Sequence, residues 1–383
     1  MEQMPGCAHR RAIRSRVNRP RWRRLVTEEK RVLMSRSSRF LRACWREPVD
    51  AAPVWFMRQA GRYQPEYRQL RERYSLLQIC QEPELCARVT RLPVEQLGVD
   101  AAILFSDISL PIGAMGRQFE IQEHIGPVLA QPLRDRRDVE SLHRFEPEEA
   151  LPYVFEAIRE LKRTLTVPLI GFAGAPFTLA SYLIEGGPSR DYRLTKQMMW
   201  AQPDLWQDLM DTLADITVRY LKAQVEAGAD AVQLFDSWVG SLAPEDYRGF
   251  VLPTMRRIMD ELRPLAVPLI YFGVTTGELL PIWRETGATV IGVDWRVDMA
   301  DAARRVGNEI ALQGNLDPAL LFAPWEVIEA RARSILDAGL SHPGFIFNLG
   351  HGVHRLTDGS KLKRLAAFVH EYSQQKLAEV EVK

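Results

Sequence analysis

Eight short apolar runs, each separated from the next by a longer segment of helical character, constrain the fold of this chain more than any other feature. The runs are short and rich in β-branched and aromatic residues, which is typical of buried strands. Several of the intervening segments end at glycine, which is favoured just after a helix. Strands and helices that alternate in this way indicate a parallel sheet covered by helices. The runs lie at residues 53–57, 101–106, 168–174, 231–237, 268–274, 289–295, 309–315 and 345–351.

Eight strand-helix units predict a single closed (β/α)8 barrel of the TIM type, with the active site at the C-terminal ends of the strands. An open, doubly wound sheet is the alternative. Such a sheet commonly carries a glycine-rich phosphate loop after an early strand, and neither GxGxxG nor GxxxxGK[ST] occurs in this chain. The closed barrel is therefore the favoured interpretation, and nucleotide binding loses support.

The composition is that of an ordinary soluble globular protein. Hydrophobic residues make up 46% of the chain and charged residues 26%, which leaves ample material for a core. No apolar run approaches the roughly 18 residues that a membrane-spanning helix needs. The cysteines, which show no paired zinc pattern, favour reduced thiols in a cytosol-like compartment, so we expect a cytoplasmic protein without a membrane partner. They are Cys7, Cys44, Cys80 and Cys86.

A basic extension precedes the first predicted strand. Residues 1–33 hold ten Lys or Arg against three Glu, a formal charge of +7, whereas the remaining 40 basic and 46 acidic residues give −6. The extension has little apolar periodicity, and it is interpreted as a disordered tail or a mis-assigned start with Met34 as the true one. An organelle transit peptide or a nucleic-acid-binding arm is the alternative. We therefore divide the chain into an extension, 1–36, and one barrel domain, 37–383, for which we expect no nucleic-acid partner.

Two arginines follow the first predicted strand. Arg58 and Arg62 stand four residues apart in the string MRQAGRY, with Gly61 between them. Guanidinium groups offer planar pairs of donors that match carboxylates or phosphates, so the pair suggests an anionic substrate with more than one acid group. The alternative is two surface arginines in ordinary ion pairs.

An aspartate stands inside the second apolar run. Asp107, in the string ILFSDISLP, follows residues that should be buried, where an unpaired carboxylate is costly. It therefore needs partners, and it either caps a following helix, holds a buried arginine, or acts in a binding site at the strand end.

Other polar residues at predicted strand ends have both a structural and a functional interpretation. Asp236 and Ser237 could cap the next helix. Tyr182 could be a packing residue, and His351 could be a hydrogen-bonded structural histidine. HExxH, HxH and CxxC are absent, and no cysteine follows Cys86, so a zinc-thiolate site at the later strands is excluded. The residue types indicate a pocket for a large, flat polyacid, without a metal or organic cofactor.

Several long strings, in consistent order over about residues 39–372, resemble the uroporphyrinogen decarboxylase family. The resemblance implies a (β/α)8 barrel, a homodimer, and removal of CO2 from the four acetate side chains of uroporphyrinogen III to give coproporphyrinogen III in haem biosynthesis, without a cofactor. The strings are MRQAGRY, FSDI, GFAGAPFTLASYLIEGG, FDSWVG, GVDWR, QGNLDP and NLGHG.

The resemblance also implies roles for individual residues. Arg58 and Arg62 would hold substrate carboxylates, and one of them would be a proton donor. Asp107 would accept hydrogen bonds from the pyrrole N–H groups, so these three are the expected catalytic residues. The other residues that the resemblance assigns to substrate binding are Tyr182, Ser237, His351, Phe105, Phe172, Phe235 and Tyr67.

One loop departs from the family pattern. After Gly352 the family commonly continues with a proline and a Thr-Pro-Pro-Glu type string, whereas residues 353–359 here read VHRLTDG. Two alternatives accompany the expected activity. One is a non-catalytic tetrapyrrole-binding protein. The other is a corrinoid-dependent methyltransferase of the same barrel superfamily, which would need a zinc-binding His and Cys set late in the chain.

Overall fold

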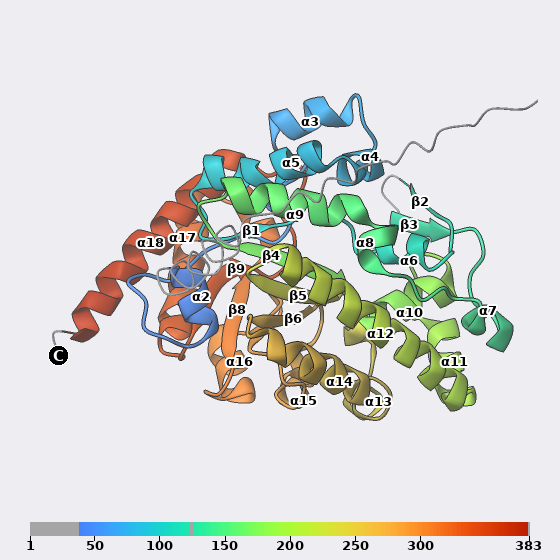
Figure 1. Ribbon diagram of the computed structural model, residues 1–383. Helices are drawn as coiled ribbons and strands as arrows, with labels where there is room; N and C mark the ends of the chain where they lie inside the picture. Colours follow the sequence, from blue (N-terminus) through green and yellow to red (C-terminus); the bar gives the residue numbers. More distant parts are fainter. Residues whose placement is uncertain (1–37, 123–125, 382–383) are drawn as a thin grey trace, which may run out of the picture. The chain divides into compact units, whose positions relative to one another are not determined.

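The structure is a computed structural model that describes residues 38–122 and 126–381 (Figure 1). The basic extension, including Met34, lies outside the described residues. Seven parallel strands form one sheet in the order β1-β4-β5-β6-β7-β8-β9, so strands that follow one another in this sheet are also neighbours. This is an α/β fold with a parallel sheet, as predicted. The strands are β1 (Ala102–Ile103), β4 (Leu169–Gly174), β5 (Ala231–Asp236), β6 (Leu269–Gly273), β7 (Val290–Gly292), β8 (Ala311–Leu316) and β9 (Phe345–Leu349).

The predicted strand at 53–57 is wrong as a regular strand, because it makes only one isolated parallel bridge, between Val54 and Phe347. Side chains bind backbone groups that a neighbouring strand would otherwise bind. The amide oxygen of Gln59 accepts from Phe56 N at 3.1 Å, and that of Asn348 accepts from Met57 N at 2.9 Å. The start of the run still hydrogen-bonds to β9, the last strand of the sheet, and to the residue before β1, the first strand. Phe347 N donates to Pro53 O and Asp100 N donates to Val54 O, each at 2.8 Å.

Proline divides several of the predicted helical segments. The residue before a proline is disfavoured in the α conformation, and Glu82 and Gln202 accordingly leave it before Pro83 and Pro203. The principal helices are α2 (Arg39–Cys44), α3 (Pro65–Arg71), α4 (Leu76–Gln81), α5 (Pro83–Leu97), α6 (Leu110–Ala114), α7 (Arg136–Glu140), α8 (Pro147–Ala150), α9 (Pro152–Thr164), α10 (Pro176–Glu185), α11 (Arg193–Ala201), α12 (Pro203–Ala227), α13 (Pro244–Phe250), α14 (Leu252–Leu262), α15 (Leu280–Trp283), α16 (Met299–Val306), α17 (Trp325–Leu340) and α18 (Gly359–Glu381).

A short antiparallel hairpin between β1 and β4 in the chain was not predicted. It pairs β2 (Phe119–Gln122) with β3 (Gly126–Leu129), outside the parallel sheet. The side chains of β2 alternate between half-buried and exposed. The segment therefore lacks the continuous apolar run that predicts a buried parallel strand.

The helices pack against one another around the sheet. Figure 1 shows α12 running beside β5, and α12 contacts α9, α10 and α14. The last helix, α18, packs against both α17 and α5, so the end of the chain contacts a helix near its start. Trp55, Trp206 and Trp283 are fully buried in one continuous core.

Two further predictions concern the thiols and the membrane. Cys44, Cys80 and Cys86 are free and buried, as expected for reduced thiols, and Cys7 lies outside the described residues. Among the described helices, none combines the length and the apolar character that crossing a bilayer requires.

Candidate active site

Arg58 lies in the turn that follows the run 53–57. Its backbone has the left-handed conformation, with φ of 55°, which is uncommon for a residue other than glycine. Its side chain is exposed. The neighbouring peptide is fixed, because Met57 N donates to Asn348 Oδ1 at 2.9 Å and Met57 O accepts from Val353 N at 2.9 Å.

Arg62 stands just before α3, near an aromatic pair. Tyr67, in α3, is buried, and its ring lies 5.3 Å from that of Phe105, centroid to centroid. Burial raises the pKa of Tyr67, whereas the positive charges of Arg71 and Arg62 lower it. The charge of Arg62 thus acts on Tyr67. The ring of Tyr67 packs against Phe105, which stands two residues before Asp107 in the sequence.

Asp107 lies in the turn after β1 and is half-buried. One carboxylate oxygen, Oδ1, accepts from the backbone N of Ser109 at 2.9 Å and from its hydroxyl at 2.5 Å. Among the described residues, no donor contacts the other oxygen, Oδ2. Ser109 is the residue before α6, whose first turn has no side-chain cap, so Asp107 orders the turn that leads into this helix, and one of its oxygens remains available to a ligand.

Tyr182, in α10, lies within the electrostatic reach of two other predicted site residues. Burial raises the pKa of its phenol, the negative charge of Asp107 raises it further, and the positive charge of Arg58 lowers it. Its ring lies 3.9 Å from that of Trp238, which follows β5 next to the half-buried Ser237. Tyr182 is therefore protonated at neutral pH and can donate a hydrogen bond.

His351 follows β9 and is half-buried. Burial, with the positive charges of Arg58 and Arg296, lowers the pKa of its imidazole to about 4, and the negative charge of Asp294 only partly opposes this. The ring lies 5.9 Å from that of Trp295. At neutral pH the imidazole is uncharged, so it can share the site with Arg58 without repulsion.

Aromatic rings lie along the strands of this region. The rings of Phe172 in β4 and Phe235 in β5 meet edge to face at 5.4 Å, and Phe235 meets Phe272 in β6 at 6.1 Å. Tyr67 and Phe105 form a second such pair, so each of these four aromatic residues predicted for the site packs against another ring.

Asp236, the last residue of β5, does not cap a helix, which was one of the two interpretations that the sequence left open. It is fully buried and accepts from Thr178 Oγ1 and from the hydroxyl of Tyr271, each at 2.7 Å. Burial raises its pKa to about 6, against the opposing effect of these two hydrogen bonds. The carboxyl of Asp236 thus links Thr178, which lies in α10 four residues before Tyr182, to the turn that carries Ser237. The position of Asp236 at a strand end is the only sign of this role that the sequence offers.

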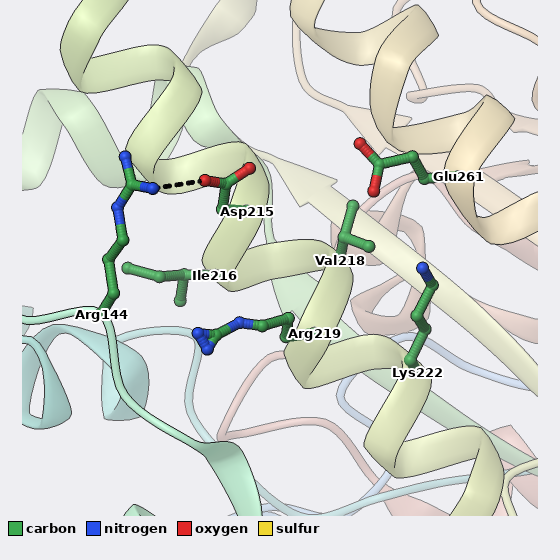
Figure 2. A pocket seen from close by; sticks show the side chains of 7 residues that line it. All are labelled: Arg144, Asp215, Ile216, Val218, Arg219, Lys222 and Glu261. Carbon is green, nitrogen blue, oxygen red and sulfur yellow. Dashed lines mark ion pairs between the residues drawn. The ribbon is translucent and has the colours of Figure 1, made fainter.

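A cavity of about 250 Å³ lies elsewhere, along α12 (Figure 2). Arg144 pairs with Asp215 at its edge, N to O 3.0 Å, and Lys222 extends from the helix toward Glu261. It contains none of the predicted site residues. Its remaining lining residues are Ile216, Val218 and Arg219.

Asp107 and Arg58 lie close enough to Tyr182, and Arg58 close enough to His351, for their charges to shift the pKa of these two residues. Every one of these residues follows a strand of the parallel sheet or the bridging run, or lies in the helix after one. These candidate residues thus lie at or just after the carboxyl ends of parallel strands of an α/β fold, which is where enzymes of this fold class bind their substrates.

Comparisons with known proteins give the family. Residues 35–372 match the model of the uroporphyrinogen decarboxylase (URO-D) family. The chain is 58% identical over 335 residues to the uroporphyrinogen decarboxylase of Geobacillus kaustophilus, covering 87% of this chain and 97% of that protein. It is 55% identical over 338 residues to that of Bacillus subtilis, covering 88% and 96%. The chain belongs to the uroporphyrinogen decarboxylase family.

More distant solved structures share the fold. A methyltransferase from Methanosarcina mazei superposes with a TM-score of 0.74 at 23% identity, covering 87% of this chain and 97% of that one. A B12-independent methionine synthase from Shewanella superposes with a TM-score of 0.55 at 12% identity, covering 80% and 91%. Identities this low speak for the fold alone.

Proposed function

We propose that the chain is a carboxy-lyase that converts the four acetate side chains of uroporphyrinogen III to methyl groups, giving coproporphyrinogen III without a cofactor. The family and the high identity to its enzymes support the reaction. The observation that links this reaction to the site concerns the carboxylate of Asp107. Its Oδ2 has no donor among the described residues, and its charge, like that of Arg58, acts on Tyr182.

The chemistry requires a place for two electrons. When the bond between the acetate methylene and its carboxylate breaks, CO2 leaves and the bonding pair stays on the methylene carbon. A pyrrole ring that has first taken a proton is a cation and accepts that pair. The exocyclic methylene then takes a proton, and the ring loses the first one, so each cycle replaces one carboxylate by one hydrogen.

The side chains match these steps. Asp107 accepts the pyrrole N–H bonds through its available oxygen and stabilises the ring cation, an attraction that a desolvated pocket strengthens. Arg58 and Arg62 bind acetate and propionate carboxylates and orient the departing one. One of the arginines, or a water, supplies the proton for the methylene. The protonated Tyr182, with Ser237 and the neutral His351, hydrogen-bonds the remaining side chains, and Phe105, Phe172, Phe235 and Tyr67 enclose the macrocycle.

Further parts of the proposal concern the fold and the assembly. We propose that the run 53–57 closes the sheet into a (β/α)8 barrel, since it makes backbone contacts with both β9 and the residue before β1. The family match over 35–372 supports one domain at 37–383, preceded by the extension 1–36. A cytoplasmic homodimer without nucleic-acid or membrane partners rests on the family resemblance.

The methyltransferase alternative gains no support from the site. The similarity to the Methanosarcina structure is one of fold, and no cysteine follows Cys86 in this chain to supply a late zinc thiolate. Only a measurement of activity distinguishes the proposed enzyme from the other alternative, a non-catalytic tetrapyrrole-binding protein that acts as a carrier.

Anaerobic incubation of the purified chain with uroporphyrinogen III, followed by chromatography of the products after oxidation, tests the proposal. We expect coproporphyrin, preceded by intermediates with seven, six and five carboxylates, as each acetate is lost in turn. Dialysis against a chelator should leave the rate unchanged. Tight binding of uroporphyrinogen without any product would contradict the proposal and favour a carrier.

A further inference from the structure

Strand β9 and the turn after it hold the backbone of the residue that precedes Arg58. Met57, which precedes Arg58, is held at both of its backbone groups: its N donates to the side chain of Asn348 at 2.9 Å, and its O accepts from Val353 N at 2.9 Å. Asn348 is fully buried in β9. The peptide that carries Arg58 is therefore fixed to the end of β9 and to the segment directly after it.

Gly352 packs against the aliphatic part of Arg58. A Cβ added at Gly352 would lie 2.5 Å from Cδ, 2.8 Å from Cγ and 3.0 Å from Cβ of the arginine. These distances are shorter than van der Waals contact, and the atoms include the base of the side chain, which cannot move away as a flexible tip can. Any residue other than glycine at position 352 must therefore shift Arg58.

The conformation of Arg58 must be stabilised by its neighbours. It is exposed, and its backbone is left-handed, a state that persists in non-glycine residues only where the surroundings determine it. The neighbours that could do so are the contacts of Met57 and the surface of Gly352.

We propose that Gly352 is a positioning residue, which acts with Asn348 to hold Arg58 in the orientation that binds a substrate carboxylate. The inference rests on the proposed function, because it supposes that Arg58 contacts substrate.

The test compares two glycine-to-alanine variants. Gly352→Ala should lower kcat/KM for uroporphyrinogen by between about tenfold and a hundredfold, the cost of misplacing a binding group by roughly 1 Å. Gly249→Ala is the matched control, because an added Cβ there meets no heavy atom within 4 Å and the residue lies in α13. The control should keep wild-type kcat/KM, and circular dichroism should show both variants folded.

A double-mutant cycle separates positioning from general damage. In an Arg58→Ala background the contacts with Cδ at 2.5 Å and Cγ at 2.8 Å are gone and only the looser contact with Cβ at 3.0 Å remains, so Gly352→Ala should change kcat/KM by less than about twofold. An equal loss with and without the arginine stem would overturn the proposal, as would wild-type activity of Gly352→Ala itself.

A second variant keeps the proposal testable if Gly352→Ala does not fold. Asn348→Leu removes the acceptor of Met57 N and of Leu349 N while keeping a side chain that branches at the same atom, and its loss of kcat/KM should likewise disappear in the Arg58→Ala background. The same cycles can be measured as the Kd of uroporphyrin, followed by fluorescence quenching. Absence of turnover in the wild type would contradict the proposed function, whereas additive effects on Kd would contradict the positioning of Arg58.

Discussion

The aspartates at the two ends of β1 differ in how many groups bind their carboxylates. At the amino ends, Asp100 precedes β1, and its carboxylate accepts from Val54 N at 2.7 Å and contacts His370 at 2.7 Å and Arg39 at 3.3 Å. At the carboxyl end of β1, Asp107 binds, within the part of the chain that the structure describes, only Ser109, through a single oxygen.

A second aspartate repeats the pattern at the amino ends. Asp230 precedes β5, accepts from Leu169 N at 3.0 Å and pairs with Lys162 at 2.5 Å. The carboxylates of Asp100 and Asp230 are thus occupied in joining segments of the chain to one another. The comparison teaches that Asp100 and Asp230 stabilise the fold at the amino ends, whereas Asp107 retains capacity for a ligand at a carboxyl end, where enzymes with parallel sheets bind their substrates.

The largest expected effect is on Asp107. Replacing it by Asn should lower kcat/KM for uroporphyrinogen about a thousandfold, because the ring cation loses its counter-charge in the pocket. The free energy of unfolding, from urea titration, should change by less than about 1 kcal/mol, since the Asn oxygen can still accept from Ser109. Near-wild-type turnover by a folded variant would refute the role of Asp107.

Asp236 sharpens the comparison, because it lies at a carboxyl end yet is fully hydrogen-bonded. Its pKa is about 6 in the folded protein and near 4 in the unfolded chain, so its contribution to stability is present below about pH 4 and lost as the pH rises through 6. The change amounts to roughly 3 kcal/mol at most.

Asp236→Asn should remove this dependence. The difference in unfolding free energy between the variant and the wild type should shift in favour of the variant as the pH rises from 4 to 7. Urea titrations at several pH values measure it. A difference that stays constant over this range would show that Asp236 titrates alike in the folded and unfolded states.

Asp100→Asn tests the other end. The variant loses the charge that Arg39 and His370 contact, and we expect a decrease of about 2 kcal/mol in the free energy of unfolding. The values of kcat and KM should stay within about twofold of the wild type, because no residue of the candidate site contacts Asp100. A selective loss of kcat with full stability would break the comparison.

The smallest effect concerns His351. Because its pKa is lowered to about 4, its contribution to stability is present above about pH 6.5 and is lost as the pH falls toward 4. NMR titration should show the His351 imidazole resonances constant from pH 7.5 to 5.5, with His351→Gln used to assign them. A midpoint near pH 6.5 would mean that neither burial nor Arg58 acts on the ring.

The local apolar pattern predicted most strands of the sheet. It failed where contacts with distant residues determine the hydrogen bonding of a segment. Residues 169–174 and 311–316 lie within apolar runs or next to them and became strands with nearly the predicted bounds. The run at 53–57 is equally apolar, but Gln59 and Asn348 take the N–H groups of Phe56 and Met57. The partner of a backbone group 291 residues away cannot be read from the run itself.

The candidate site shows the same division. Arg58, Asp107 and His351 could be proposed because each follows an apolar run, and the ends of parallel strands meet at one edge of a sheet. Gly352 could not, since its importance lies in the atoms of Arg58 that occupy the space of its missing side chain. The partners of Asp236 come from two other elements and were equally invisible.

The most direct test measures turnover and stability together in Asp107→Asn and Asp100→Asn. Anaerobic assays with uroporphyrinogen give kcat/KM, and urea titrations of the same preparations give the free energy of unfolding. We expect Asp107→Asn to be stable and nearly inactive, and Asp100→Asn to be active and less stable. An active Asp107→Asn, or an Asp100→Asn that is stable and inactive, would contradict a decarboxylase site at the carboxyl ends of the strands.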